Sequence, residues 1–122
     1  MKLQKLGVGF WATFSDRRVK KDIRPYTRGL NEIKQINPVW YKYNELSGYK
    51  DTENDYVGII AQEIEHVLPN TVSEFDDSNN SGISYKKQFN GSEVMWTLVN
   101  AVKELTQKIE TLEACIKELE KK

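Results

Sequence analysis

The residues with the clearest potential for covalent chemistry lie near the N-terminus, in a run that begins at Ser15. A serine hydroxyl stands there within six residues of four cations, which are Arg17, Arg18, Lys20 and Lys21. A serine nucleophile needs a base, and a lysine can serve as that base when neighbouring cations or burial destabilise its ammonium form. A pair of Ser15 and Lys20 is therefore chemically feasible, although a solvated basic loop is the commoner use of such a run.

The spacing of Ser15 and Lys20 limits how they could meet. An offset of five residues puts two side chains on opposite faces of a strand and about 140° apart around a helix. The pair can meet only where the chain bends or bulges between them, and Asp16 could cap such a turn. A catalytic pair at these positions therefore requires a turn rather than a regular element.

The same four cations could instead hold an anion or the phosphate of a nucleotide. The chain has no Gly-rich phosphate loop, so binding would rest on the side chains of Arg17, Arg18, Lys20 and Lys21. Residues 1–42 carry a net charge of +7 and residues 43–91 carry −6. This asymmetry suits an anion-binding surface, but the two parts could equally pack against each other or against a neighbouring subunit.

Length and composition exclude several classes of protein. The chain has 122 residues with 39% hydrophobic residues, enough for a single domain with a core. It has no apolar run of membrane-spanning length and no signal peptide, which predicts a soluble protein made in the cytosol. A single cysteine and a single histidine argue against an internal disulfide and against a metal centre built from these ligands. We expect no required cofactor.

A heptad pattern runs through the C-terminal quarter of the chain. Apolar residues recur there at alternating spacings of four and three, and neither Gly nor Pro occurs in residues 92–122. This pattern predicts a long helix with a coiled-coil seam, capped at its start by Ser92. A helix of roughly 45 Å is too long to bury its seam on an 80-residue body, so we expect it to pair with copies of itself. The seam consists of Leu98, Val102, Leu105, Ile109, Leu112, Ile116 and Leu119.

The apolar stripe of this helix is wide in the first half and narrow in the second. Val94, Val99 and Ala101 flank the first half of the seam, whereas mostly polar residues flank the rest. A wide stripe suits packing on a globular body, so we expect the first half to dock and the second half to project. β-Branched residues at the a positions with Leu at d favour two strands in peptides, and Lys108 and Glu113 are spaced for pairing between parallel helices.

The rest of the chain alternates short strands and helices. We expect strands or extended segments at 8–14, 38–43, 56–60, 71–75 and 83–85, short helices at 28–36 and 61–68, and a loop at 45–55. The aromatic residues Trp40, Tyr41 and Tyr43 favour a covered strand over a base-stacking surface. The fold class is therefore α+β: a small mixed globular body followed by a long C-terminal helix.

Several motifs occur in an order that resembles a known family. The first motifs are Ser15-Asp16-x-Arg18-Val19-Lys20-x-Asp22-Ile23, Gly29-Leu30-x-x-Ile33 and Pro38-x-x-Tyr41-x-Tyr43. The most recognisable follows, Gly58-Ile59-Ile60-Ala61-Gln62-Glu63-Ile64-Glu65, and then come Leu68-Pro69, Ile83-x-Tyr85 and Leu98-Val99-x-Ala101-Val102-x-Glu104-Leu105. Over about residues 15–122, the set resembles the intramolecular chaperone domain at the C-termini of bacteriophage endosialidases, tail spikes, tail fibres and neck appendages.

The resemblance implies a self-cleaving trimerisation chaperone. Such domains trimerise, guide the folding of a long β-structured fibre upstream, and are then released by autoproteolysis just before the serine. On this sequence it implies Ser15 as the nucleophile, Lys20 as the general base and Phe14–Ser15 as the scissile bond of a single-turnover reaction. Candidate supporting residues are Asp16, Arg18, Gln62 and Glu63.

The resemblance also implies a parallel trimeric coiled coil, and we favour three strands over two because a docked body can override the preference of the seam. Residues 1–14 would be the end of an upstream fibre or a pre-cleavage arm, residues 15–91 the chaperone body, and residues 92–122 the trimerising helix. The expected partners are two further copies of the chain and the upstream fibre of the same polypeptide, without a membrane or a nucleic acid. The expected location is the host bacterial cytoplasm, as a precursor of a virion appendage.

Three functions remain open on the sequence alone. They are the self-cleaving chaperone, a structural trimer clamp without chemistry, and an anion- or nucleic-acid-binding module that uses the basic third of the chain. His66 could assist proton transfer and Cys115 could crosslink chains, but a surface histidine and a packed thiol are the commoner roles. For Glu63, the usual role is that of a carboxylate near the start of a helix.

Overall fold

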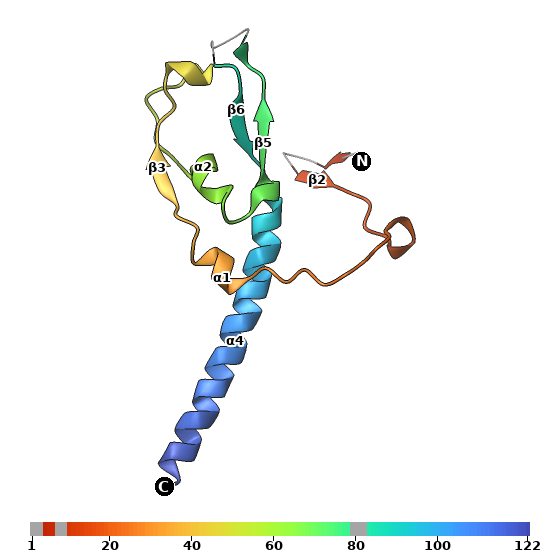
Figure 1. Ribbon diagram of the computed structural model, residues 1–122, viewed down its shortest axis with the longest axis vertical. Coiled ribbons are helices and arrows are strands. Elements are labelled where there is room, and N and C mark those ends of the chain that lie inside the picture. The colour runs from red at the N-terminus through yellow and green to blue at the C-terminus, as the bar shows by residue number, and fades with distance from the viewer. Residues whose placement is uncertain (1–3, 7–9, 79–82) are drawn as a thin grey trace.

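A computed structural model of the chain describes residues 4–6, 10–78 and 83–122. Within these residues the chain forms three hairpins of antiparallel strands, several short helical turns and one long C-terminal helix (Figure 1). The strands are β1 (Gln4–Leu6), β2 (Phe10–Ala12), β3 (Val39–Tyr41), β4 (Tyr56–Gly58), β5 (Val72–Phe75) and β6 (Lys86–Phe89). The helices are α1 (Leu30–Ile33), α2 (Ala61–Ile64) and α4 (Ser92–Glu120), with 3-10 turns η1 (Arg17–Val19), η2 (Glu45–Ser47) and η3 (Pro69–Thr71). The α+β class is confirmed.

The three pairs of strands do not join into one sheet. Strand β1 pairs with β2, β3 with β4 and β5 with β6, and each pair is antiparallel. A lone two-stranded ribbon is marginally stable in water, so each hairpin depends on what packs against it. The described part of the body consequently has little regular structure of its own, and α1 and η3 are the elements with the most extensive contacts to α4.

The long helix is the structural centre of the chain. Helix α1 and turn η3 pack against the first half of α4, and the second half extends away from the body (Figure 1). The prediction of a docked first half and a projecting second half is therefore confirmed. The docking face differs from the one expected, because Ala101 is buried whereas Val99, on the other side of the seam, is exposed.

The buried core among the described residues is small, and its side chains come from α2, the region of η3 and the first half of α4. The described residues with buried side chains include Ile64, Leu68 and Ala101, together with Thr71 and Thr97. Both threonines satisfy their hydroxyls locally: Thr71 Oγ1 donates to the Leu68 carbonyl at 2.6 Å, and Thr97 Oγ1 donates to the Glu93 carbonyl at 2.9 Å. Local satisfaction removes the cost of burying these hydroxyls.

Most predicted elements of the body exist but are shorter than expected. The predicted helices at 28–36 and 61–68 shrink to four residues each in α1 and α2. After each of them the chain continues with 3-10 hydrogen bonds, in which a backbone amide donates to the carbonyl three residues earlier. The predicted strands at 38–43 and 56–60 shrink to β3 and β4. Pro38 and Pro69 limit the segments that they border, since proline donates no backbone hydrogen bond.

The last hairpin is displaced from its predicted position. Strand β5 agrees with the prediction, but its partner is residues 86–89 rather than 83–85. The register of this pair runs from Val72↔Phe89 to Phe75↔Lys86. A hydrogen bond from the Asn90 amide to the Thr71 carbonyl, at 2.8 Å, extends the ladder by one residue. Ion pairs from Lys87 to Glu65 and Glu74 tie β6 to α2 and β5. Residues 8–9 of the predicted segment 8–14 and residues 79–82, which lie between the last two predicted strands, are outside the described residues.

A cluster of tyrosines covers one face of the β3–β4 hairpin. The rings of Tyr41, Tyr43, Tyr49 and Tyr56 lie with centroids 4.6–5.9 Å apart, and the Tyr41 and Tyr43 hydroxyls are 3.1 Å apart. The hydrogen bond with Tyr41 raises the pKa of Tyr43 to about 12. The opposite face carries Trp40, whose side chain is 75% exposed, so the prediction of a covered aromatic strand is wrong for this residue. Alternation along a strand places neighbouring side chains on opposite faces, and only the tyrosine face meets other rings.

Candidate functional site

The chain turns sharply between Ser15 and Lys20. Residues 17–19 form the 3-10 turn η1, and the Val19 and Lys20 amides donate to the carbonyls of Asp16 and Arg17 at 3.0 and 3.2 Å. Neither residue of the predicted pair lies within a regular strand or an α-helix. The turn shortens the path between them and is the kind of bend that the spacing requires.

Asp16 caps this turn with its carboxylate. Its Oδ1 accepts from the Arg18 amide at 2.9 Å, and the Arg18 guanidinium donates to both carboxylate oxygens, with Nη2 2.8 Å from Oδ2. The hydrogen bonds from the Arg18 guanidinium lower the pKa of Asp16 below its usual range. The carboxylate is thus charged at neutral pH and accepts from both the amide and the guanidinium.

The turn brings Ser15 and Lys20 into direct contact. Lys20 Nζ donates a hydrogen bond to Ser15 Oγ at 2.8 Å. A base must lie within about 2.6–3.2 Å of the hydroxyl that it deprotonates, and this distance falls in that range. Both side chains are exposed in the single chain. The arrangement could therefore support nucleophilic chemistry at Ser15 once Lys20 is a neutral amine.

Residues 13–25, which we call the site loop, keep their hydrogen bonds to themselves. Among the described residues, the side-chain hydrogen bonds of this segment stay within it, and it extends away from α4 (Figure 1). Asp22 adopts a positive φ of 54° in the loop, a conformation that non-glycine residues adopt infrequently. The site loop is thus held in its turn by local bonds alone.

The cations of the loop do not gather at one point. Lys20, Lys21 and Arg24 line an open hollow of about 440 Å³ together with Tyr26, whereas Arg17 and Arg18 belong to the turn. Arg18 is already paired with Asp16. The four-cation patch considered for an anion is therefore divided between the turn and the hollow.

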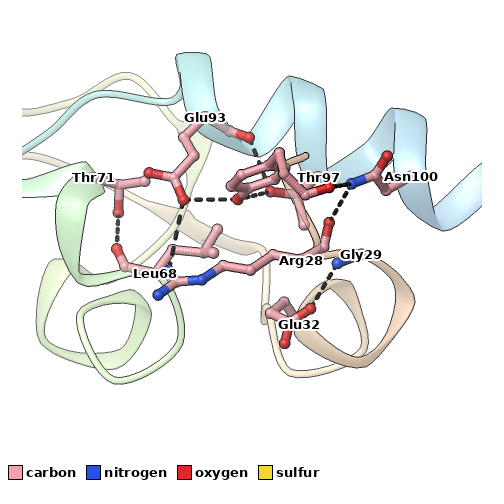
Figure 2. A network of polar contacts seen from close by, with 9 residues as sticks. Arg28, Gly29, Glu32, Leu68, Thr71, Glu93, Thr97 and Asn100 are labelled. Atoms are coloured by element: carbon pink, nitrogen blue, oxygen red, sulfur yellow. Dashed lines mark hydrogen bonds and ion pairs between the residues drawn. The ribbon is translucent and has the colours of Figure 1, made fainter. Parts of the chain in front are cut away.

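A polar network anchors the chain directly after the site loop. The Tyr26 hydroxyl donates to Glu93 Oε2 at 2.7 Å and lies 2.8 Å from Thr97 Oγ1, and burial raises the pKa of this phenol. Asn100 Nδ2 donates to the carbonyls of Tyr26 and Arg28 at 2.8 Å each. Figure 2 shows Glu93, Thr97 and Asn100 reaching from one side of α4 toward this segment. The network fixes the C-terminal end of the site loop to the long helix.

The anchor continues through Gly29, where the chain passes close to α4. The Gly29 amide donates to Glu32 Oε1 at 2.6 Å, and the Leu30 amide donates to Glu104 Oε2 at 2.8 Å. The Gly29 amide lowers the pKa of Glu32. A Cβ atom on Gly29 would lie 2.5 Å from Glu104 Oε1 and 3.1 Å from Asn100 Cβ. A larger residue here would have to displace the Glu104 carboxylate and press on Asn100.

Sequence reasoning missed these anchoring residues, although the sequence holds a signal for them. Residues Glu93, Thr97, Asn100 and Glu104 are spaced by four, three and four residues, like the apolar seam but displaced around the helix. Heptad spacing places all of them on one face. A polar stripe with the period of the seam indicates a second docking surface on the same helix.

The seam itself remains uncovered in the single chain. The exposed fractions of its seven residues lie between 44% and 66%. The whole chain exposes 10634 Å², whereas a compact monomer of 14.2 kDa would expose about 6,800 Å². The seam and the network occupy different faces of α4, so copies of the chain can use the seam without displacing the anchor.

The other candidate residues stand apart from Ser15. Gln62 and Glu63 lie on α2, which Figure 1 places on the other side of α4 from η1. His66 and Cys115 are both exposed. None of the described helices is both long and apolar enough to span a bilayer. Across residues 4–6, 10–78 and 83–122, no three side chains of His, Cys, Asp or Glu gather as a set of metal ligands.

Comparisons with known proteins agree with the motifs. Residues 15–73 match a peptidase family described as Chaperone of endosialidase. The chain is 32% identical over 100 residues to the long tail fiber protein Gp37 of Enterobacteria phage K3 and, equally, to that of Enterobacteria phage T2. Each alignment covers 82% of this chain but only 8% and 7% of the two fibre proteins, respectively. The matched segment begins at Ser15 and ends within β5, and this part of the chain belongs to the chaperone-of-endosialidase family.

Proposed function

We propose that this chain is a C-terminal intramolecular chaperone of a phage tail-fibre, tail-spike or neck-appendage protein. It trimerises through α4, assists the folding of the fibre upstream, and is released by cleavage of its own Phe14–Ser15 bond. Membership of the chaperone-of-endosialidase family and the similarity to two phage tail fibre proteins support the chaperone role. On this proposal the protein acts during virion assembly in the host cytoplasm, as part of the precursor of an appendage.

The cleavage reaction uses Ser15 and Lys20. The neutral amine of Lys20 accepts the proton of the Ser15 hydroxyl, and Ser15 Oγ attacks the carbonyl carbon of Phe14. The bond between that carbon and the Ser15 nitrogen breaks, and the proton passes from Lys20 to the departing amine. Water then hydrolyses the ester that joins Phe14 to Ser15 Oγ, which restores the hydroxyl and leaves Ser15 as a new N-terminus.

The observation that carries this proposal is the 2.8 Å hydrogen bond from Lys20 Nζ to Ser15 Oγ in a turn that directly follows the scissile bond. The capping of that turn by Asp16 and Arg18 supports it, because their bonds hold the two ends of the turn together. Gln62 and Glu63 can support Ser15 only from a neighbouring copy, since they lie on α2 and the site loop extends to the other side of α4 (Figure 1).

The proposal of a trimer rests on the uncovered seam. Seven apolar residues on α4 lie exposed in one chain, and burying a Leu or Ile side chain contributes about 1.5–3 kcal/mol. The seam alone does not decide between two and three strands, and the family favours three. Release after assembly has a physical purpose: without its chaperone the fibre cannot retrace its folding path, and it becomes kinetically stable.

Mass spectrometry of the protein, expressed with whatever its gene encodes before residue 1, tests the cleavage. The wild type should give a product that begins at Ser15, and Ser15→Ala and Lys20→Ala should remain whole. Lys20→Arg is the sharpest variant, because arginine keeps the charge and a donor to Ser15 but cannot lose its proton in a protein. Lys103→Ala, which removes an exposed cation on α4, should cleave like the wild type.

The same experiment separates the two leading functions. If the assembled wild-type trimer keeps its Phe14–Ser15 bond, the peptidase interpretation fails and the chain is a structural clamp. Cleavage that persists in Lys20→Arg would exclude Lys20 as the base. Sedimentation of each variant before analysis ensures that loss of cleavage is not loss of assembly.

A further inference from the structure

The outer face of the β3–β4 hairpin is an apolar surface without a partner among the described residues of the chain. Trp40 and Val57 lie directly opposite each other in the two strands, and their side chains are 75% and 61% exposed. The Lys42–Asp55 ion pair extends the same face by one step at 2.9 Å. The tyrosine cluster occupies the other face and therefore cannot cover Trp40. An exposed tryptophan beside an exposed valine is typical of a protein interface.

The site loop is a second exposed surface. Its three large apolar side chains, Phe14, Val19 and Ile23, are each more than half exposed. It carries five Lys or Arg residues and two Asp, a net charge of +3. Residues 42–58, which form the end of the hairpin and include the Lys42–Asp55 pair, carry four Asp or Glu and two Lys, a net charge of −2. The two surfaces are therefore complementary in both apolar character and charge.

The two surfaces cannot meet within one chain as it is folded. Figure 1 places β3 on one side of α4 and the site loop on the other. The network at Tyr26 fixes the end of the loop to α4, so the loop cannot swing freely around the helix. The loop extends outward from its anchor at Tyr26, so a hairpin face that covers it has to come from an adjacent copy.

We infer that the site loop of each copy docks on the Trp40–Val57 face of the next copy around the seam. Such a contact joins two different surfaces, and it closes into a ring when the copies are related by rotation about the coiled-coil axis. This inference rests on the trimer of the proposed function and adds the partner surface of the loop that carries Ser15. Docking holds the loop only after neighbours have assembled, which links scission to assembly.

Crosslinking tests the ring directly. The variant Ile23→Cys with Val57→Cys, on a Cys115→Ser background, is treated with a short bismaleimide and separated under denaturing conditions. A ring gives covalent dimers and trimers, because each link joins two chains. The control pairs Ile23→Cys with Gln88→Cys, which lies exposed on β6 away from the proposed contact, and should remain monomeric. The experiment is repeated with Val19→Cys in place of Ile23→Cys, because one pair of cysteines could be badly oriented for the crosslinker even in a correct ring.

Links formed only within single chains, or at the level of the control in both variants, would overturn the docking.

A second experiment replaces Trp40 by Ser and compares this variant with Trp96→Ser, which removes an exposed tryptophan from α4 outside the seam. Trp40→Ser should sediment as the wild type but cleave at least roughly tenfold more slowly, and Trp96→Ser should cleave normally. Equal cleavage in the two variants contradicts the inference.

The failures of the two proposals can be told apart. A crosslinked ring with an uncut Phe14–Ser15 bond would leave the docking standing and remove the peptidase. If the wild type cleaves normally but gives no crosslinked ring, and Trp40→Ser cleaves at the wild-type rate, the docking is wrong and the peptidase interpretation stands. A chain that sediments as a monomer would remove both the trimer and the ring.

Discussion

Asp16 is the residue on which the geometry of the candidate site depends most directly. Its carboxylate accepts from the Arg18 amide and guanidinium and so closes the turn that brings Lys20 Nζ to Ser15 Oγ. The site loop has no other support among its described contacts, since its hydrogen bonds are local. A single side chain can therefore change how often the Ser15–Lys20 contact forms without touching either residue.

Replacement of Asp16 by Ala should slow cleavage, whereas replacement by Asn should change it little. Asparagine keeps an oxygen that can accept from the Arg18 amide, and alanine removes the cap. We expect a loss of roughly tenfold for Asp16→Ala and less than about threefold for Asp16→Asn, measured as the rate at which the new Ser15 N-terminus appears. Equal rates in the wild type and Asp16→Ala would show that the cap does not position the pair.

The pKa of Asp16 sets the pH range in which this comparison is informative. Arg18 lowers this pKa, so the folded turn binds a proton at the carboxylate less readily than the unfolded chain does. The contribution of the cap is complete above the ordinary pKa of Asp, about 3.9, and is lost as pH falls through the lowered value. The ratio of the cleavage rate of the wild type to that of Asp16→Ala should therefore be the same at pH 6 and pH 8.

At the scale of elements, α4 has an apolar face, the seam, and a separate polar face that binds the segment after the site loop. Its apolar seam faces outward, while Glu93, Thr97, Asn100 and Glu104 hold the segment from Tyr26 to Leu30. A hydrogen bond of this kind contributes about 1 kcal/mol net, and several together fix one element on another. The anchor fixes the root of the site loop on a different face of α4 from the seam, so the seam stays open to neighbouring copies.

Gly29→Ala tests how closely this anchor is packed. The new Cβ would meet the Glu104 carboxylate and Asn100 Cβ, so the carboxylate must shift and its hydrogen bond from the Leu30 amide is weakened. We expect a loss of about 1–2 kcal/mol in the free energy of unfolding, measured with urea. The φ of Gly29 is −161°, outside the left-handed region, so the variant tests the contact made by the added methyl group.

A double-mutant cycle identifies the contact responsible. In a Glu104→Ala background the carboxylate is gone, and Gly29→Ala should cost clearly less than it does alone. The same cost in both backgrounds would mean that Asn100 or the backbone, rather than Glu104, opposes the added methyl group.

At the scale of the whole molecule, one chain is an incomplete structure. Three separate hairpins, a small core and an uncovered seam leave far more surface than a monomer of this mass normally exposes. Our two proposals assign the largest exposed apolar features to contacts between copies. The seam would join the helices, and the Trp40–Val57 face would receive the site loop of the next copy.

Ile109→Asn should break the oligomer. Isoleucine at this seam position is exposed in the single chain, and in the assembly the asparagines of the copies would replace its packed apolar contacts with buried polar groups, at a cost in stability. We expect a loss of about 2–5 kcal/mol per chain and a shift to monomers in sedimentation velocity. Glu110→Asn, which changes the neighbouring position outside the seam, should leave the oligomer intact, and unchanged assembly of Ile109→Asn would contradict the role of the seam.

Local patterns were enough to predict the long helix, the α+β class and the family. Heptad spacing from Leu98 to Leu119 is a property of consecutive residues, so it needs no knowledge of the rest of the fold. The requirement for a turn between Ser15 and Lys20 likewise follows from their spacing, and the structure places a capped turn there. Both features depend on interactions between residues close together in sequence.

Contacts between distant residues decided the rest. Helix α1 is shorter than predicted, the tyrosines stack on one face while Trp40 stays bare, and the Tyr26–Leu30 segment docks on α4 through side chains 67 to 74 residues away. Short elements bury too little surface to form by their own propensity, so their limits are set by what lies beside them. Only the tertiary structure shows which of these partners the chain itself provides and which surfaces it leaves for other copies.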